Sequence, residues 1–182
     1  VSYWIPGFFG SLAAVPPTPG WSVANVYYHA STDAGGGVQF PRGGAVVAGL
    51  EGEVDLGFVS PSYTFATPVL WGGLATLAVL VPYGHLDASV EATLAGPLGR
   101  TISLGRSDDR TGFGDVPLLV KVNWNAGVHN YMVYGALNIP NGTFERRLAN
   151  LSVGHWAFDS GVGYTYFDQK SGWELSAVLG AT

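Results

Sequence analysis

The segment 50–58 alternates acidic and apolar residues along the chain. The acids are Glu51, Glu53 and Asp55, and the apolar residues are Leu50, Val54, Leu56 and Phe58. Because successive side chains of a β-strand point to opposite faces, this segment has one acidic and one apolar face. The alternation recurs in at least four further segments, which predicts an all-β fold. Such strands bury their apolar faces in one of two ways. Two sheets pack into a sandwich, or one sheet closes into a barrel whose apolar side faces lipid.

The composition narrows the class of protein. The chain has 182 residues, enough for one domain, and only 12% are charged, about half the usual share of roughly 25%. Cysteine is absent, which excludes disulfides, a thiolate nucleophile and a cysteine-ligated zinc site. The net charge of -5 argues against a nucleic-acid partner.

An uncharged stretch, Leu56 to Gly84, has the length of a membrane-spanning helix. Three prolines and the pair Gly72-Gly73 lie within it, and each breaks or weakens a helix. We therefore interpret the stretch as two strands joined by a turn.

The pattern predicts an antiparallel up-and-down transmembrane β-barrel of about seven strands. They are expected at about 21–30, 45–65, 74–94, 113–125, 128–139, 153–167 and 173–182. Residues 1–20, rich in proline and glycine, form an N-terminal segment near or inside the lumen, and residues 21–182 form the N-terminal part of the barrel. Single-chain bacterial barrels have even strand numbers. We therefore expect a fragment that lacks C-terminal strands.

The connections alternate between long and short, as they do in transmembrane barrels. The predicted long loops are 31–44, 96–112 and 139–152, and they hold six arginines that would meet lipid headgroups. Aromatic residues gather beside the short turns and predict an interfacial belt. The membrane-interface aromatics are Trp71, Trp124, Tyr131, Tyr166 and Trp173.

A soluble sandwich or jelly roll remains an alternative, because it also alternates polar and apolar residues. In that fold, lysine is expected on the solvent faces of the strands. Only Lys121 meets this expectation, which favours the membrane barrel.

Five motifs resemble one protein family. They are YWIPGFFGSLAAVPPTPGW at 3–21, TGFGD at 111–115, WNAGVHN at 124–130, RLANLSVGHWA at 147–157, and GYTY at 163–166 with SGWELSA at 171–177. Together they resemble the MetA-pathway of phenol degradation family, whose members are also called SphA-like outer-membrane proteins. The resemblance implies a bacterial outer-membrane barrel that is associated with the catabolism of aromatic compounds and helps them enter the cell.

The polar faces of the strands are predicted to line a lumen. The candidate lumen-lining residues are Glu51, Glu53, Asp55, His85, Asp87, Glu91, Asp115, Lys121, Asp159 and Glu174. One interpretation is an acidic permeation path that favours cations and neutral polar solutes. The other is a plugged interior whose polar groups bond to one another. Asn130, Tyr134 and Asn138 are the candidate substrate-facing residues.

No catalytic residue, metal or cofactor is expected. His85 with Asp87, and His155 with Asp159, share a face, but a metal site needs three or four converging ligands. Ser89 raises the alternative of a barrel lipid hydrolase, without a nucleophile-elbow pattern to support it. A structural or interaction barrel without a transport role is the first alternative to transport, and the lipid hydrolase is the second. The favoured function is passage of small hydrophobic or aromatic molecules through the outer membrane, with the lipid bilayer and lipopolysaccharide as partners.

Overall fold

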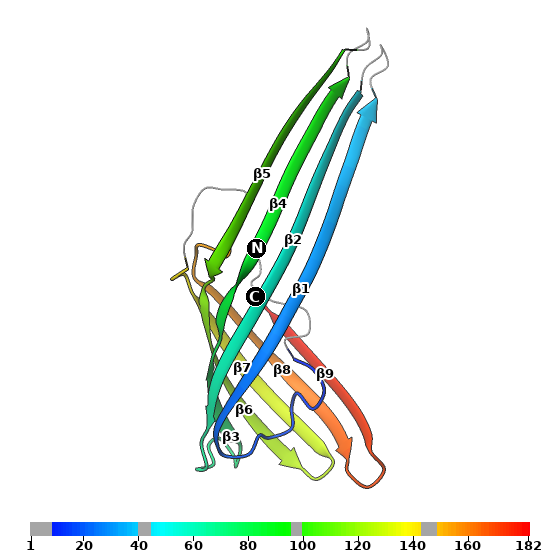
Figure 1. Ribbon diagram of the computed structural model, residues 1–182. Coiled ribbons are helices and arrows are strands. Elements are labelled where there is room, and N and C mark those ends of the chain that lie inside the picture. Colours follow the sequence, from blue (N-terminus) through cyan, green and yellow to red (C-terminus); the bar gives the residue numbers. More distant parts are fainter. Residues whose placement is uncertain (1–8, 40–44, 96–99, 143–148) are drawn as a thin grey trace.

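The computed structural model describes residues 9–39, 45–95, 100–142 and 149–182. These residues form one antiparallel sheet, which confirms the predicted all-β fold (Figure 1). Its strands are β1 (Gly20–Gln39), β2 (Ala45–Thr64), β3 (Leu74–Val79), β4 (Val81–Ala95), β5 (Thr101–Phe113), β6 (Val116–Ala126), β7 (His129–Ile139), β8 (Ala157–Asp168) and β9 (Trp173–Ala181). Among the described residues, no helix has the length and hydropathy needed to cross a membrane.

The sheet is an up-and-down meander, as predicted. β2 pairs with both β3 and β4 in one uninterrupted register, so β3 and β4 are one strand interrupted at Leu80. β5 and β6 pair with that strand and likewise follow one another. Counted in this way, the described sheet has the seven successive strands that the sequence predicts.

The pairing is irregular on the strand formed by β5 and β6, beside Pro82 of β4. Three residues lie between Val79 and Tyr83, whereas four lie between their partners Leu118 and Phe113. The extra residue is a β-bulge, which turns the side chains after it to the other face. Odd-numbered side chains of β5 therefore share a face with even-numbered side chains of β6.

Two of the predicted long loops are mostly strand. β1 continues to Gln39 through a glycine-rich stretch, and β5 occupies the predicted polar loop from Thr101 onward. Glycine and charge suggested loops here, but backbone pairing with β2 and β4 stabilises these segments. The connection between β7 and β8 stays without strand structure where it is described.

The strands form two regions of different height (Figure 1). The base, which curls into a half-barrel, contains β3, β6 to β9 and the residues 20–27 and 57–64 of β1 and β2. The extension contains β4, β5 and the residues 28–39 and 45–56, and it runs on past the base as a single layer. β1 and β2 have 20 residues each, about 65 Å at roughly 3.3 Å per residue. β6 and β7 have 11 each, about 36 Å.

The N-terminal segment crosses the concave face of the base, seen in dark blue in Figure 1. A turn at Ser11–Val15 is closed by a hydrogen bond from Val15 N to Leu12 O, 3.0 Å, and Leu12 has a positive φ of 59°. Ala14 is fully buried in a cluster with residues of β3, β6 and β7. The small core of the molecule thus lies between this segment and the half-barrel wall.

Candidate functional site

Polar side chains share the concave face of the base with the small apolar core. On β7, Asn130 and Asn138 are buried, and Thr165 of β8 is fully buried opposite Asn130. The N-terminal segment bonds to this face: Ala14 N donates to Thr165 Oγ1 at 3.1 Å, and Asn123 Nδ2 donates to Ala14 O at 2.9 Å. The polar interior is therefore tied to a chain segment that fills its lower part.

Glu174 of β9 anchors the same segment from the other side. Its carboxylate accepts hydrogen bonds from Ser11 Oγ at 2.7 Å and from Leu12 N at 2.8 Å. Phe9 packs on Tyr134, with ring centroids 4.7 Å apart. Three strands of the half-barrel, β6, β8 and β9, hold the segment in place by hydrogen bonds.

The outward face of the base is apolar and exposed. It is formed by valine, leucine and aromatic side chains such as Val120, Val133 and Leu175, which are 51%, 48% and 66% exposed. Exposed apolar faces of this extent mark a surface that meets lipid or another apolar partner. The base therefore has the polarity of a membrane barrel, polar within and apolar outside.

Aromatic residues border this apolar face at two levels. The lower belt lies at the short connections and includes Trp21, Tyr63, Phe65, Trp71, Trp124, Tyr131, Tyr166 and Trp173. The upper belt, which the sequence pattern did not reveal, contains Tyr27, Tyr83, Phe113, Trp156 and Phe158. Six to eight residues of strand separate the two levels on β2 and β8, about 20–26 Å. Strands of transmembrane barrels tilt by about 35–45°, so this spacing corresponds to about 14–21 Å along a barrel axis, less than the roughly 25 Å apolar band of such barrels.

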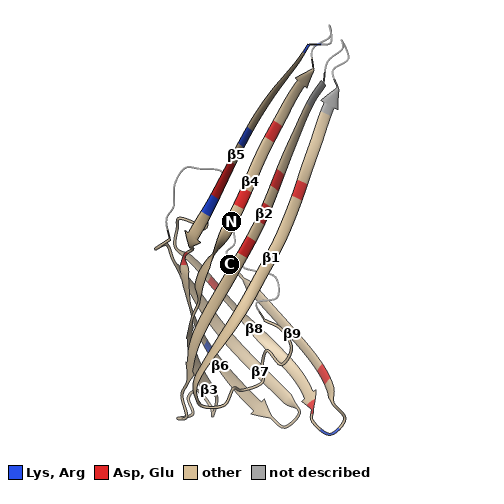
Figure 2. Cartoon of the chain, in the orientation of Figure 1, with Lys and Arg blue, Asp and Glu red and all other residues tan. Residues whose placement is uncertain are grey.

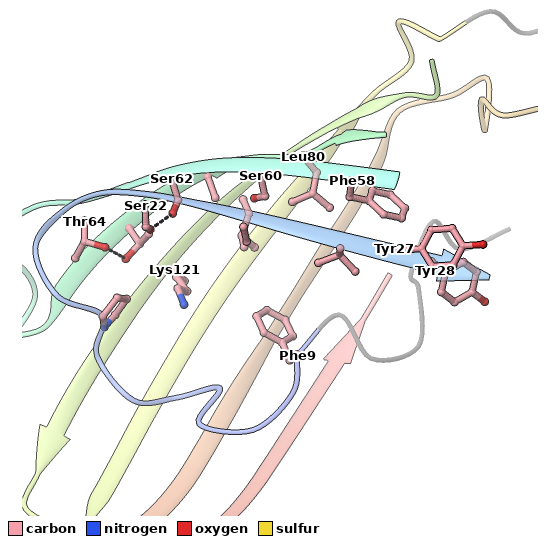
Figure 3. A pocket seen from close by; sticks show the side chains of 16 residues that line it. Phe9, Ser22, Tyr27, Tyr28, Phe58, Ser60, Ser62, Thr64, Leu80 and Lys121 are labelled. Carbon is pink, nitrogen blue, oxygen red and sulfur yellow. Dashed lines mark hydrogen bonds between the residues drawn. The ribbon is translucent and has the colours of Figure 1, made fainter. Parts of the chain in front are cut away.

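A cavity of about 530 Å³ opens on the concave face above the N-terminal segment (Figure 3). One end carries hydroxyl groups and an amine, from Ser22, Ser62, Thr64, Thr76 and Lys121. The other end is apolar and aromatic, with Phe9, Val26, Phe58 and Leu80 among its lining residues. This volume and mixture of groups are typical of sites for small molecules, which need about 300–1,000 Å³.

The structure separates the ten predicted lumen-lining residues into two groups on opposite faces of the sheet. Asp115, Lys121, Asp159 and Glu174 lie on the concave side of the base. The others lie in the extension, where Figure 2 shows most of the charge. They are Glu51, Glu53, Asp55, His85, Asp87 and Glu91, and the register places them on the face that continues the outward face of the base. The ten therefore do not form one acidic lining.

The reason is visible along β2. On its odd-numbered face, the apolar Val59 and Tyr63 of the base give way to Asp55, Glu53 and Glu51 in the extension. On its even-numbered face, Ser60 and Ser62 give way to apolar side chains. These are Phe58, Leu56, Val54 and Leu50. The polarity of the two faces is thus exchanged at the level of the upper aromatic belt, and no bulge in β2 accompanies the exchange.

The three predicted substrate-facing residues are buried in the wall and do not line the cavity. Asn130 bonds to Asn125 at 2.7 Å and to Thr165 O at 3.3 Å. Asn138 donates to Asp115 Oδ2 at 3.1 Å. Tyr134 is 3% exposed and lies beneath Phe9. The two asparagines thus link β7 to neighbouring parts of the wall, and Tyr134 links it to the N-terminal segment.

Asp115 lies between β5 and β6, at the bulge and outside both strands. It accepts hydrogen bonds from Ser152 Oγ at 2.7 Å, Val153 N at 2.8 Å, Gly142 N at 3.0 Å and Asn138 Nδ2 at 3.1 Å. Burial alone would raise the pKa of this carboxyl, but these hydrogen bonds outweigh burial and lower the pKa below its ordinary value. Asp115 fastens the β7–β8 connection to the wall. The sequence did not reveal this role, because Asp115 is a single acidic residue before a strand and belongs to no recognisable motif.

His29, Glu53 and Asp55 bring three possible metal ligands together in the extension, with donor atoms within 4.8 Å of one another. Asp55 already accepts hydrogen bonds from Tyr27 and from His29, the latter at 2.8 Å, and these lower its pKa. His85 Nε2 lies 2.8 Å from Asp87 on the same face. All three side chains lie on the acidic face of the extension, where His29 and Glu53 are exposed.

The residues needed for a serine hydrolase do not converge around Ser89. Ser89 and His85 are four residues apart on β4, which places them about 13 Å apart along the strand. A nucleophile and its base need about 2.6–3.2 Å. His155 and Asp159 are also separate: His155 Nδ1 is 2.9 Å from Val153 O, and Asp159 bonds to Thr182.

Sequence comparison matches residues 35–182 with a family described as "Putative MetA-pathway of phenol degradation". No curated protein and no solved structure matches the chain.

Proposed function

Because this chain belongs to the MetA-pathway of phenol degradation family, we propose that it is a barrel of the bacterial outer membrane that admits small hydrophobic or aromatic compounds. The base spans the apolar layer, and the extension projects beyond it into water. The compounds enter along the extension and reach the cavity of the base.

Two observations support the membrane placement. The outward face of the base is apolar, and aromatic belts border it at two levels. Above the upper belt the same face becomes acidic, as a surface in water or among the cation-bridged headgroups of lipopolysaccharide would be.

The observation that carries the proposed passage is the apolar inward face of β2 and β4 in the extension. Leu56, Val54 and Leu50 of β2 lie on the same face as Phe58, which lines the cavity. On β4, Leu86, Val90 and Leu94 add apolar side chains to that face. On β5, Ile102 and Leu104 continue it, whereas Arg106, Asp108 and Arg110 lie on the same face nearer the base. A water-exposed apolar surface that leads to a cavity favours hydrophobic solutes over sugars and ions.

Uptake into vesicles tests the proposal. The full-length protein is reconstituted in vesicles with lipopolysaccharide in the outer leaflet, and entry of a radiolabelled aromatic compound is compared with entry of glucose. We expect the protein to speed aromatic entry but not glucose entry. Entry no faster than in protein-free vesicles would remove the transport function and leave a structural or interaction barrel.

A matched pair of variants identifies the cavity as the route. Ala24 lines the cavity, and its neighbour Asn25 lies on the outward face. Ala24→Trp fills the cavity and is expected to reduce aromatic uptake by several-fold, whereas Asn25→Trp places the same ring outside and leaves uptake unchanged. Equal uptake by both variants would place the route elsewhere.

A further inference from the structure

Lys121 places an amine inside the cavity. It lies on β6 between Leu119 and Asn123, and the register sets it opposite Thr76, which is itself opposite Thr64. Figure 3 shows its side chain directed into the space between β1, β2 and the N-terminal segment. The hydroxyl end of the cavity is thus also its cationic end.

Within the described part of the chain, Lys121 has neither an ion pair nor a hydrogen-bond partner. The ion pairs found there involve His29 with Asp55 and His85 with Asp87, both in the extension. The nearest hydroxyl pairs bond to each other, Thr64 with Thr76 at 2.9 Å and Ser22 with Ser62 at 2.8 Å. Lysine is rarely withdrawn from water without an anionic partner. The cavity therefore offers a cation that an entering molecule can neutralise.

The described lining of the cavity contains no aspartate or glutamate that would compete for this amine. Its opposite end presents Phe9, Phe58 and Leu80, which suit a ring or a short apolar chain. A ligand that satisfies both ends has an apolar body and one anionic group.

We infer that Lys121 selects small aromatic carboxylates by pairing with the carboxylate, while the ring packs against the apolar end. The inference rests on the proposed passage of aromatic compounds and specifies their class. Lys121 acts here as a specificity-determining residue, since a neutral aromatic compound of the same shape uses the apolar end alone.

Binding of benzoate and of its neutral analogue benzamide tests the inference. Full-length protein in lipid nanodiscs is titrated at neutral pH, where benzoate is anionic, by isothermal titration calorimetry. We expect benzoate to bind at least about tenfold more tightly than benzamide. Lys121→Met, which keeps the length of the side chain, should lower benzoate affinity by about tenfold and change benzamide affinity little. A charge-assisted hydrogen bond has this magnitude, since each 1.4 kcal/mol is tenfold in affinity.

Two further variants control for charge and for folding. Lys121→Arg keeps the cation and should retain most of the preference for benzoate. Lys170→Met removes a lysine from the exposed turn between β8 and β9 and should leave both affinities unchanged. Retention of the heat-modifiable gel shift of folded barrels shows that each variant is folded.

The outcomes separate this inference from the proposed function. Equal binding of benzoate and benzamide, or unchanged benzoate affinity in a folded Lys121→Met protein, overturns the role of Lys121 and leaves aromatic passage standing. Absence of binding by both compounds, together with vesicle uptake no faster than background, overturns both.

Discussion

The base and the extension use the same strands but reverse the polarity of their faces. In the base, the concave face carries serine, threonine and asparagine, and the outward face carries exposed valine, leucine and aromatic residues. In the extension, β2 and β4 have an acidic face that continues the outward side and an apolar face that continues the concave side. On β5, the face that continues the concave side also carries Arg106, Asp108 and Arg110. β1 and β2 pass through both regions in one register.

This difference shows what two-residue periodicity specifies. Alternation fixes that a strand has two unlike faces, but the surroundings decide which face is turned inward. In lipid the apolar side chains face out. In water, the stable arrangement turns the charged side chains out and the apolar ones toward the interior. The exchange at the upper aromatic belt is therefore the position at which the strands would leave the membrane.

The strongest test of the comparison places one charge on the outward face of each region. Val120 lies in the middle of the apolar band on β6, and Glu53 lies on the acidic face of β2. We expect Val120→Arg to destabilise the protein in phospholipid vesicles by about 2–4 kcal/mol, the cost of arginine near the bilayer midplane. Glu53→Arg should change stability by less than about 0.5 kcal/mol. Urea titration followed by tryptophan fluorescence measures both, and equal stabilities would show that the base does not meet lipid.

The next test concerns Asp115, which lies where the extension strand β5 meets the base strand β6. Asp115→Asn keeps the shape of the side chain but replaces one acceptor oxygen with a donor that faces existing donors. We expect a loss of about 2 kcal/mol, because a buried group loses charge-assisted hydrogen bonds. Ser152→Ala removes one of these bonds and should cost about 1 kcal/mol. Both values are measured by urea titration, and a neutral Asp115→Asn would show that the carboxylate does not fasten the connection.

The same residue gives a pH dependence with a definite sign. Because the folded-state pKa of Asp115 is lowered from the ordinary value of 3.8, its contribution is fully present well above pH 3.8. The contribution declines as the pH falls through the folded-state pKa. Stability curves measured between about pH 7 and pH 3 should therefore fall less steeply for Asp115→Asn than for the unaltered protein. Parallel curves would contradict a lowered pKa.

The sequence predicted the sheet better than the site. The alternation at Glu51–Asp55 and the prolines between Leu56 and Gly84 correctly indicated strands and an up-and-down order. The glycines at 35–37 and the charges at 106–110 suggested loops, but both segments are strands. The prediction failed because local composition carries no information about pairing with a distant strand. The extra residue of the bulge at Gly114-Asp115 has no strong sequence signal. The resulting exchange of side-chain faces between β5 and β6 was therefore not predicted. Ser60, Ser62 and Thr64 do alternate with apolar neighbours, and that signal would have located the cavity.

The anchoring of the N-terminal segment is a weaker test, confined to the base. Glu174→Ala removes the acceptor of two hydrogen bonds from Ser11 and Leu12, while the bonds of Ala14 remain. If the segment restricts passage, we expect the conductance of the full-length protein in planar bilayers to rise by about fivefold or less. A loss of ~1 kcal/mol in anchoring free energy changes the equilibrium between the anchored and released segment by this factor. Leu175→Ala, one residue away on the outward face, is the control. An unchanged conductance would place the segment outside the path.

The smallest expected effect distinguishes the two interpretations of the acidic residues. A lumen lined by Glu51 and Glu53 would lose cation preference when both become glutamine. The register instead places both on the face opposite the cavity, so the double variant Glu51→Gln, Glu53→Gln should leave the reversal potential in a salt gradient unchanged. Lys121→Met serves as the positive control, because it removes a charge from the cavity itself and should shift the potential toward cations. A shift in the glutamate variant would mean that ions follow the acidic face. The acidic face of the extension would then be its inner face, and the inference that the two faces exchange polarity at the upper aromatic belt would be wrong.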